Sequence, residues 1–350
     1  MFSLLEKTKG YQVVCQWLTA KNRHPFVFQQ ETWQHINAAE SGLVNAPTGC
    51  GKTFSVFLGA IISFINQYPD DYKRKSGKPG SGWGLQLLWV TPLRALAKDI
   101  ARAMEEVVEE LGVDWKIGIR NGDTSTIERA RQKKQLPEVL LITPESLHLL
   151  FAQKNYPDLF SSLKIIAVDE WHELLGSKRG VQVELAIARL LTLEADKNAR
   201  IRSDELPANN PAFITLYTKL CIWGISATIG NLEEAMQVLL TPRLTREDTR
   251  GRIVRANLHK QIEISSIIPD EREKYPWAGH LGLKLIDKVL PVIYSSQTTL
   301  IFINTRGMSE RWYQSLLTAA PDLAGAIGCT MVLLIWNSGP GWKITCTLAN

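Results

Sequence analysis

The run APTGCGKT constrains the fold of this chain more than any other feature, and it begins with Ala46 where a phosphate-binding loop usually has its first glycine. It follows the short apolar stretch SGLVN and leads into the helix-like stretch FSVFLGAIISFI. Gly49 and Gly51 permit backbone N–H groups to turn inward onto phosphate oxygens, and Lys52 adds a positive charge. The hydroxyl of Thr53 can bind Mg²⁺. A strand, a glycine-rich turn and a helix in this order predict a nucleotide phosphate loop, and the alternative is a turn without chemical meaning.

The candidate nucleotide-binding residues of this run are Pro47, Thr48, Gly49, Cys50, Gly51, Lys52 and Thr53.

Strand-length apolar runs recur along the first two thirds of the chain, and each ends in polar or small residues. They include GLQLLWVTPL, EVLLITPESL, KIIAVDEWHE and KLCIWGISATIG. Helix-like stretches such as ALAKDIARAMEEVVEEL, with apolar residues three and four positions apart, lie between them. This alternation is typical of a parallel sheet that is buried on both faces. We therefore predict an α/β fold with a doubly wound parallel sheet.

Length and composition set broader limits. The chain has 350 residues, which suits two domains, and 45% of them are hydrophobic and 21% charged. No apolar run approaches the roughly 18 residues of a membrane span, and the N-terminus lacks a secretory cleavage site. We expect no membrane association and a cytoplasmic location. The five cysteines form no C-x-x-C pair, which argues against zinc and disulfide sites. The net charge of +5 is a mild bias towards polyanionic partners.

Three stretches interrupt the alternating pattern. Residues 67–84 and 195–212 are rich in Gly, Pro, Asn and charge, and they predict surface insertions without regular structure. The pattern breaks again over residues 241–255, so we place a domain boundary close to Thr245.

A pair of carboxylates follows the buried strand in IIAVDEWHE. A phosphate loop needs a carboxylate for its magnesium and a group that orients the attacking water. Asp169 is the candidate for the metal, together with Thr53, and Glu170 is the candidate general base. Acidic pairs at strand ends are common, so this assignment depends on the accompanying loop. His172 follows two residues later, and an ordinary surface histidine is its alternative.

Six motifs in order give the chain a specific resemblance. APTGCGKT, TPLRALA, TPESL, VDEWHELLGSKRGVQVE, SATIGNLEEA and LIFINTR resemble motifs I, Ia, Ib, II, III and IV of superfamily 2 DExH-box helicases. The finer resemblance is to the large helicase-related group and, within it, to the ligase-associated DEXH-box helicases. FVFQQETWQHINAAESGLVNAPTG is similar to the Q-motif region of that group, and PDEREKYPWAGHLG to its interdomain segment. The resemblance implies a RecA-like first domain over residues 1–245 and the beginning of a second RecA-like domain over residues 246–327.

The resemblance also implies roles for individual residues. Gln29 would read the adenine of ATP, with Gln30 as the alternative, and Lys52, Asp169, Glu170 and His172 would form the catalytic set with Mg²⁺. Ser226, Ala227 and Thr228 would couple the nucleotide state to the second domain. The residues implied to line a nucleic-acid-binding face are Thr91, Pro92, Arg94, Thr143, Pro144, Glu145, Asn304, Thr305 and Arg306. Such a face contacts mostly phosphate and sugar, so it reads little sequence.

The implied function is an ATP-dependent DNA helicase or translocase that acts on single-stranded DNA in repair, with an ATP-dependent DNA ligase as a partner. An RNA substrate remains an alternative, because a groove that follows the backbone distinguishes the two poorly. RNGDTS (residues 120–125) is a further candidate contact or simply an Asn-Gly turn. We expect SKRG (residues 177–180) to be a solvated turn and Trp171 to be a packing residue.

The residues after Ile327 follow neither a helical nor a strand pattern. Codons one nucleotide out of register can encode the His-His-Gly element that the family has here, so residues 328–350 are interpreted as a frameshifted tail that begins at Gly328. A divergent terminus is the alternative, and the nucleotide sequence across codon 328 decides between them. On this interpretation the chain lacks the arginines that reach the γ-phosphate, so we expect an ATP-dependent helicase chain of low activity that keeps nucleotide binding better than turnover. A second hypothesis is a non-catalytic fragment that binds nucleotide or nucleic acid without unwinding.

Overall fold

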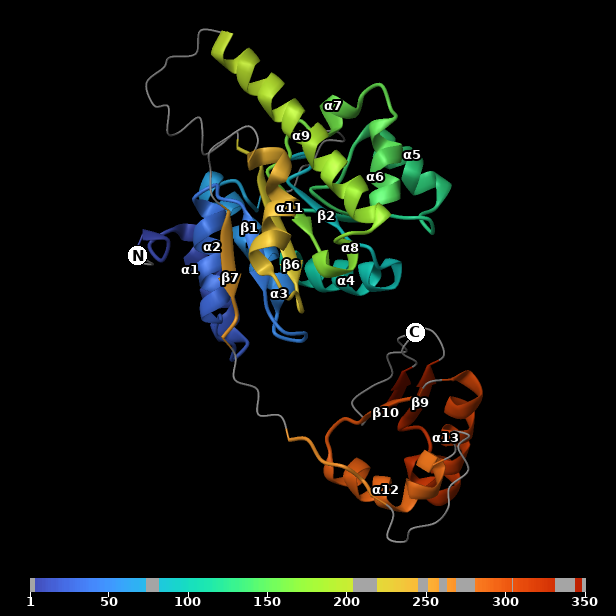
Figure 1. Ribbon diagram of the computed structural model, residues 1–350. Coiled ribbons are helices and arrows are strands. Elements are labelled where there is room, and N and C mark those ends of the chain that lie inside the picture. Colours follow the sequence, from blue (N-terminus) through green and yellow to red (C-terminus); the bar gives the residue numbers. More distant parts are fainter. Residues whose placement is uncertain are drawn as a thin grey trace. The chain divides into compact units, whose positions relative to one another are not determined.

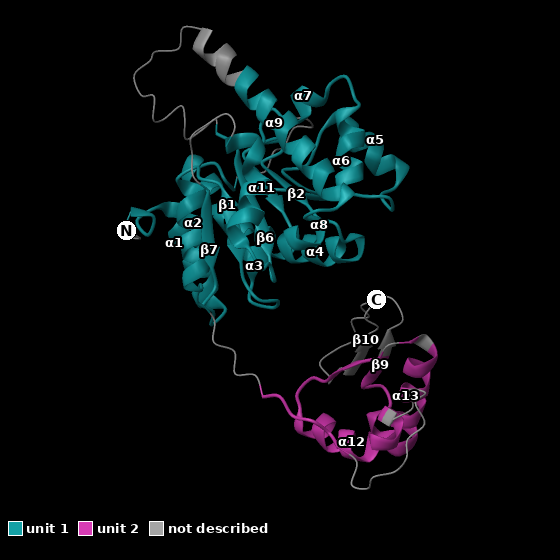
Figure 2. Cartoon of the chain, viewed as in Figure 1, with its two compact units in different colours: residues 1–258 teal, residues 259–350 magenta. Residues whose placement is uncertain are grey.

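The computed structural model forms two compact units, residues Met1–Leu258 and His259–Asn350, and each is described by itself (Figure 2). The residues that the structure describes are 4–73, 82–203, 219–244, 251–257, 263–268, 281–303, 305–330 and 344–347. Among the described helices, none combines the length and the apolar character that crossing a membrane requires.

The first unit contains a seven-stranded sheet in which every pair of neighbours is parallel (Figure 1). Its order is β3-β4-β2-β5-β6-β1-β7. The strands are β1 (Gly42–Asn45), β2 (Leu87–Val90), β3 (Ile117–Arg120), β4 (Val139–Ile142), β5 (Ile165–Val168), β6 (Cys221–Ser226) and β7 (Arg252–Arg255). The predicted doubly wound parallel sheet is confirmed.

The boundary between the units falls after Leu258, which is later in the chain than the predicted position at Thr245. The reason is β7, which pairs with β1 from Gly42↔Arg252 to Asn45↔Arg255 and so belongs to the first sheet. The polar stretch before β7 is therefore a connection within the first unit and does not separate the two units.

Alternate strand residues point to opposite faces of the sheet, and both faces are buried. On β2, Leu87 and Trp89 join one hydrophobic cluster, while Leu88 and Val90 join the other. The same alternation holds on β4 and β5. This is why the strands read as continuous apolar runs in the sequence.

Helices from different parts of the chain cover the two faces (Figure 1). α1, α2, α3 and α4 contribute to the first cluster, and α6, α8, α9 and α11 to the second. The helices are α1 (Lys9–Ala20), α2 (Val27–Asn37), α3 (Lys52–Gln67), α4 (Arg94–Leu111), α5 (Thr126–Lys134), α6 (Pro144–Phe151), α7 (Tyr156–Leu159), α8 (Trp171–Leu174), α9 (Lys178–Ser203) and α11 (Leu232–Leu244).

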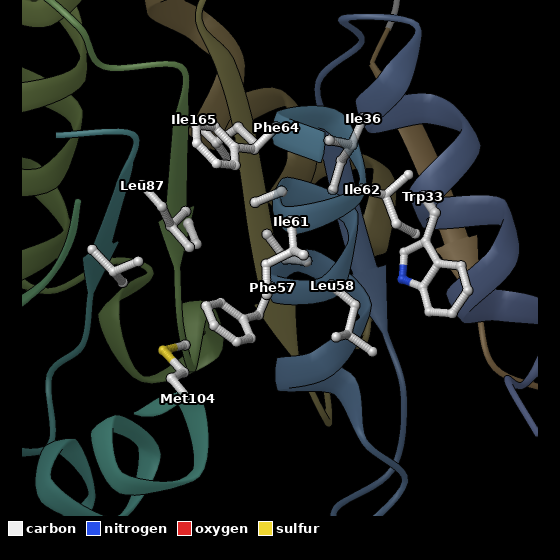
Figure 3. Packing of buried hydrophobic residues seen from close by; sticks show 14 of the residues in the cluster. Trp33, Ile36, Phe57, Leu58, Ile61, Ile62, Phe64, Leu87, Met104 and Ile165 are labelled. Carbon is white, nitrogen blue, oxygen red and sulfur yellow. The ribbon is translucent and has the colours of Figure 1, made fainter. Parts of the chain in front are cut away.

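The helix α3 is buried on more than one side, as its nearly uniform apolar sequence predicts. Figure 3 shows Phe57 and Ile61 on the side of Leu87, and Ile62 on the side of Trp33 in α2. Phe57, Ile61, Ile62 and Trp33 have no exposed surface. The packing therefore holds α3, and the loop before it, rigidly against the sheet.

One expected insertion is partly helical. α9 continues to Ser203, so the irregular structure predicted from residue 195 is wrong as far as that residue. The sequence ADKNARIRS contains Ala, Lys and Arg, which favour helix, and the first proline of the expected insertion, Pro207, lies after it. Residues 204–212 of this stretch, and 74–81 of the other insertion, lie outside the described residues.

The second unit is small and contains a three-stranded parallel sheet in the order β8-β10-β9. Its hydrophobic cluster includes Ile293, Trp312, Leu316 and Ile327. Its elements are η2 (Leu281–Leu285), α12 (Ile286–Ser295), β8 (Leu300–Phe302), α13 (Arg306–Ala319), η3 (Pro321–Leu323), β9 (Ile327–Thr330) and β10 (Ile344–Thr347). The frameshift hypothesis concerns the gene and stays a prediction. Most of the residues to which it applies, 331–343 and 348–350, lie outside the described part of the chain.

Candidate active site

The glycine-rich loop connects β1 directly to α3. Gly49 and Gly51 have φ angles of 76° and 75°, in the left-handed region that favours glycine. Gly51 is the residue immediately before α3, so the first N–H groups of the helix face the loop. A Cβ added at Gly49 would find no atom within 4 Å, and therefore the loop is open on that side. A turn of this shape at a helix N-terminus can bind phosphate.

The two neighbouring glutamines have different surroundings. Gln29 is buried; its amide nitrogen donates to the carbonyl of Gly51 at 3.0 Å, and its oxygen accepts from the backbone N–H of Phe26 at 3.0 Å. The side chain of Gln30 instead donates to the hydroxyl of Tyr11 at 2.8 Å. Gln29 is therefore the glutamine that contacts the phosphate loop.

Lys52 and Glu170 form an ion pair across the loop. The Lys52 Nζ atom lies 3.2 Å from Glu170 Oε1 and 3.3 Å from Oε2, although the two residues are 118 positions apart. Their side chains are 9% and 18% exposed. Glu170 has a φ of 47°, which is uncommon for a residue with a side chain. The fold thus holds the candidate base and the loop lysine together.

Asp169 is buried at the end of β5. Its Oδ2 atom accepts from the indole N–H of Trp89 at 3.4 Å, and its Oδ1 atom from the backbone N–H of Glu170 at 3.0 Å. Burial, with the charge of Glu170 as the second cause, raises the pKa of Asp169 to about 6, against the opposing effect of Lys52. The ionised carboxylate therefore has too little nearby positive charge to offset its burial, which favours the binding of a cation.

The donors available for magnesium fit that ion. Mg²⁺ commonly takes one or two carboxylates, water and the phosphates of a nucleotide. Asp169 and the half-buried Thr53 supply a carboxylate and a hydroxyl, both oxygen ligands. The described residues contain no group of three His, Cys, Asp or Glu side chains that could hold a metal alone. A magnesium ion bound by Asp169 and Thr53 would take further ligands from water and nucleotide phosphates.

His172 connects the acidic motif to the end of β6. Its Nδ1 atom lies 3.0 Å from Ser226 Oγ and 3.4 Å from Glu170 Oε2. Thr228 is exposed. The sequence reasoning missed Asn45, whose side-chain amide donates to the carbonyl of Ala227 at 3.1 Å. Two predicted coupling residues are therefore in contact with the nucleotide-loop strand and the acidic motif.

The carboxyl edge of the sheet divides into two halves. β1, β6 and β5 are neighbours and lead into the glycine-rich loop, the Ser226 segment and the acidic motif. β2, β4 and β3 are neighbours in the same way and lead into TPLR, TPES and RNGD. β2 and β5 are adjacent, so the two halves meet there.

The predicted nucleic-acid contacts of the first unit lie together at the half of the sheet edge formed by the ends of β2, β4 and β3. Thr91, Pro92, Thr143 and Pro144 are buried, and the N–H groups of both threonines donate to neighbouring strands, to Ile142 and Arg120. Arg94 is exposed, and its guanidinium lies beside Gly122 of the RNGD loop, where a Cβ would come within 2.7 Å of Nη1. In the second unit, Thr305 is exposed before α13, Arg306 begins α13, and Asn304 lies outside the described residues.

The expected solvated turn at residues 177–180 makes specific contacts. Arg179 donates from Nε to Glu145 Oε1 at 2.7 Å and from Nη1 to the carbonyl of Pro92 at 3.3 Å. Spacing in the sequence gave no signal for these contacts. The expectation for Trp171 is correct, since its ring is fully buried and its N–H donates to the carbonyl of Ala235 at 2.8 Å.

Comparison with protein families gives a match to the DEAD/DEAH box helicase model over residues 26–235. The chain is 32% identical to the ATP-dependent helicase Lhr-Core protein 2 of Thermococcus barophilus over 304 residues, which are 83% of this chain and 31% of that protein. It is 25% identical to the Lhr helicase/uracil glycosylase of Escherichia coli over 342 residues, 88% of this chain and 20% of that protein. The chain thus spans about a third or less of these relatives.

Solved structures give the same fold. The Mycobacterium smegmatis helicase Lhr bound to ssDNA and AMP-PNP matches with a TM-score of 0.65 and 24% identity, over 91% of this chain and 38% of that one. The helicase MrfA bound to DNA matches with a TM-score of 0.62 and 20% identity, over 91% and 40%. The predicted RecA-like architecture is confirmed by this likeness.

Proposed function

Because this chain belongs to the DEAD/DEAH box helicase family, we propose that it is part of an ATP-dependent helicase or translocase that moves along single-stranded DNA. One observation carries the proposal: the Lys52 ammonium lies 3.2 Å from Glu170, next to the buried Asp169 and at the opening of a left-handed glycine turn. These are the positive charge, base and metal-binding carboxylate that phosphoryl transfer requires.

Nucleotide binding changes the partner of Lys52 in this proposal. The β and γ phosphates of ATP attract the ammonium of Lys52 and weaken its ion pair with Glu170. Asp169 and Thr53 would hold Mg²⁺, which would supply positive charge to neutralise the phosphates. The released Glu170 carboxylate accepts a proton from the attacking water. Gln29 braces the loop through the Gly51 carbonyl and is the residue proposed to read the adenine.

The coupling role proposed for His172 rests on its two contacts. It lies within hydrogen-bonding distance of Ser226 and within 3.4 Å of Glu170. A change in the charge balance of Glu170 on hydrolysis therefore reaches the end of β6 directly. In this way the nucleotide state would control the approach of the second domain.

The strand-binding half of the sheet edge supports a phosphate-tracking face. α4 and α6 both begin there, after TPL and at Pro144, and helix N-termini favour phosphate. The exposed Arg94 adds positive charge. We propose DNA over RNA because the Mycobacterium smegmatis Lhr structure contains ssDNA and the MrfA structure contains DNA. A role in repair beside a DNA ligase, in the cytoplasm, is proposed from the resemblance to ligase-associated helicases.

Substitution of Lys52 tests the proposal against the non-catalytic hypothesis. In the wild-type chain we expect a low rate of Mg²⁺-dependent ATP hydrolysis that rises with added single-stranded DNA. Lys52→Ala should abolish it, while Lys98→Ala, an exposed lysine on α4, should not. Wild-type protein that binds ATP or DNA but hydrolyses nothing would favour the non-catalytic hypothesis, and equal stimulation by RNA would favour the RNA alternative.

A further inference from the structure

We propose that Arg179 is a positioning residue that links the strand-binding loops to the catalytic acidic segment, so that nucleotide and nucleic acid affect each other's binding. This inference rests on the proposed function and deepens it. Arg179 lies within the motif II run VDEWHELLGSKRGVQVE, but no role was assigned to it, since its segment was expected to be a solvated turn.

The guanidinium of Arg179 joins three segments that are distant in sequence. Its Nε atom donates to Glu145 Oε1 at 2.7 Å, and its Nη1 atom donates to the carbonyl of Pro92 at 3.3 Å. Glu145 lies in the first turn of α6, and Pro92 lies in the turn that leads into α4. The two phosphate-facing loops are thus held by one planar group, which offers several donors in a fixed geometry.

The same arginine is rigidly connected to the acidic motif. α8 begins immediately after Glu170, and its last residue is Leu174. A Cβ added at Gly180 would lie 2.2 Å from the Leu174 carbonyl oxygen, so the start of α9 is packed directly against the end of α8. Ser177 strengthens this junction, because its hydroxyl donates to the Leu174 carbonyl at 2.6 Å and accepts from Gly180 N–H at 3.2 Å. A displacement of Glu170 is therefore transmitted to Arg179 over one short helix.

Charge explains why this position needs a cation, and the two separate acceptors explain why that cation is an arginine. A free carboxylate at Glu145 would repel the phosphates of a strand, and the pairing with Arg179 neutralises it. Burial acts to raise the pKa of Glu145, but hydrogen bonds from its own backbone N–H and from Arg179 outweigh that effect and the pKa is lowered. The side chain of Arg179 is 44% exposed, so its remaining donors also face solvent beside the loops.

The structure thus contains a short path from nucleotide to strand. Glu170 leads into α8, α8 contacts the beginning of α9, and Arg179 on α9 holds both loops. Coupling between two ligands is reciprocal, so any effect of the nucleotide on strand affinity must equal the effect of the strand on nucleotide affinity. This equality provides a measurement that does not require turnover.

The test measures binding of a fluorescent oligo(dT) to the full chain with and without Mg²⁺ and AMP-PNP. In wild type we expect AMP-PNP to change the affinity by about fivefold or more. Arg179→Ala and Arg179→Lys should reduce that change to less than about twofold, while the affinity for AMP-PNP alone and the Tm stay near wild type. Lysine keeps the charge but cannot contact both Glu145 Oε1 and the Pro92 carbonyl oxygen as the guanidinium does. Arg131→Ala, which removes an exposed arginine from the far end of α5, serves as the matched control and should keep the change.

The possible failures are distinguishable. If wild type shows the coupling and both Arg179 variants retain it, the inference is overturned and the proposed function survives. If wild type binds no oligonucleotide in either state, the proposed function fails and the inference fails with it. A loss of coupling in Arg179→Ala that Arg179→Lys fully restores would also overturn the positioning role, because charge alone would then suffice.

Discussion

The ammonium of Lys52 lies between the two carboxylate oxygens of Glu170, at 3.2 and 3.3 Å. The structure therefore pairs the candidate base with the residue that is expected to bind phosphate. Phosphates that draw the lysine away would leave this carboxylate free to contact the attacking water. The ion pair thus links the availability of the base to the presence of a triphosphate.

Glu170→Gln should separate binding from hydrolysis. The amide can still accept a hydrogen bond from Lys52 but cannot take a proton from water, so the hydrolysis rate should fall by about 10² to 10⁴-fold. Affinity for ATP should stay equal to wild type or increase, because Lys52 no longer has a charged competitor. Nucleotide binding by fluorescence and phosphate release measure the two effects. Glu106→Gln, at an exposed residue on α4, is the control, and a similar loss there would contradict the assignment.

Gln29→Ala and Gln30→Ala should differ. Gln29 contacts the Gly51 carbonyl and Gln30 contacts Tyr11, so only the first substitution loosens the phosphate loop. We expect Gln29→Ala to raise the KM for ATP about tenfold, the effect of losing roughly 1.4 kcal/mol of binding free energy. Gln30→Ala should leave the KM near wild type. The opposite ranking would transfer the role to Gln30.

Asp169→Asn should stabilise the metal-free protein at neutral pH. Burial first, and the charge of Glu170 second, raise the pKa of Asp169 from 3.8 to about 6. The native state therefore binds this proton more tightly than the unfolded chain, so the free energy of unfolding decreases as the pH rises through this interval. In EDTA we expect a higher Tm for the variant than for wild type at pH 7, and similar values near pH 4. The exposed Asp123→Asn is the control, and a lower Tm for Asp169→Asn at pH 7 would refute the argument.

His172→Ala and Ser226→Ala should reduce coupling without preventing nucleotide binding. His172 is 3.0 Å from the Ser226 hydroxyl, and neither is a proposed ligand of phosphate or metal. Each variant should keep the wild-type affinity for ATP and lose most of the stimulation by single-stranded DNA. The double variant should lose no more than either single variant, because the residues act through one contact. Additive losses would show that they act separately.

Phe57→Ala should destabilise the first unit strongly. Phe57 is fully buried between α3 and the sheet (Figure 3), and the cavity left by such a truncation costs about 3 to 5 kcal/mol. The midpoint of urea unfolding should fall accordingly. Leu149→Ala, which removes a leucine that is 65% exposed on α6, should shift the midpoint little.

Sequence reasoning identified the parallel sheet because its strands are buried on both faces and read as apolar runs. It joined Lys52, Asp169 and Glu170 in one site because a phosphate loop needs a carboxylate for its metal and a group that orients water. It could not choose between Gln29 and Gln30, since adjacent helical residues differ only in the face that they present. Arg179 was missed for a related reason: its partners Glu145 and Pro92 are brought to it only by the packing of α6 and α4.

The adjacency of β2 and β5 has one more consequence. The N–H of Asp169 donates to the carbonyl of Val90 at 2.8 Å, and Val90 directly precedes Thr91. A single rung of the β ladder thus separates the candidate magnesium carboxylate from the start of the loop that is expected to contact DNA. The nucleotide site and the DNA-binding loop are therefore separated by one backbone hydrogen bond. Any substitution that displaces this pair of strand ends should disturb nucleotide binding and DNA binding together.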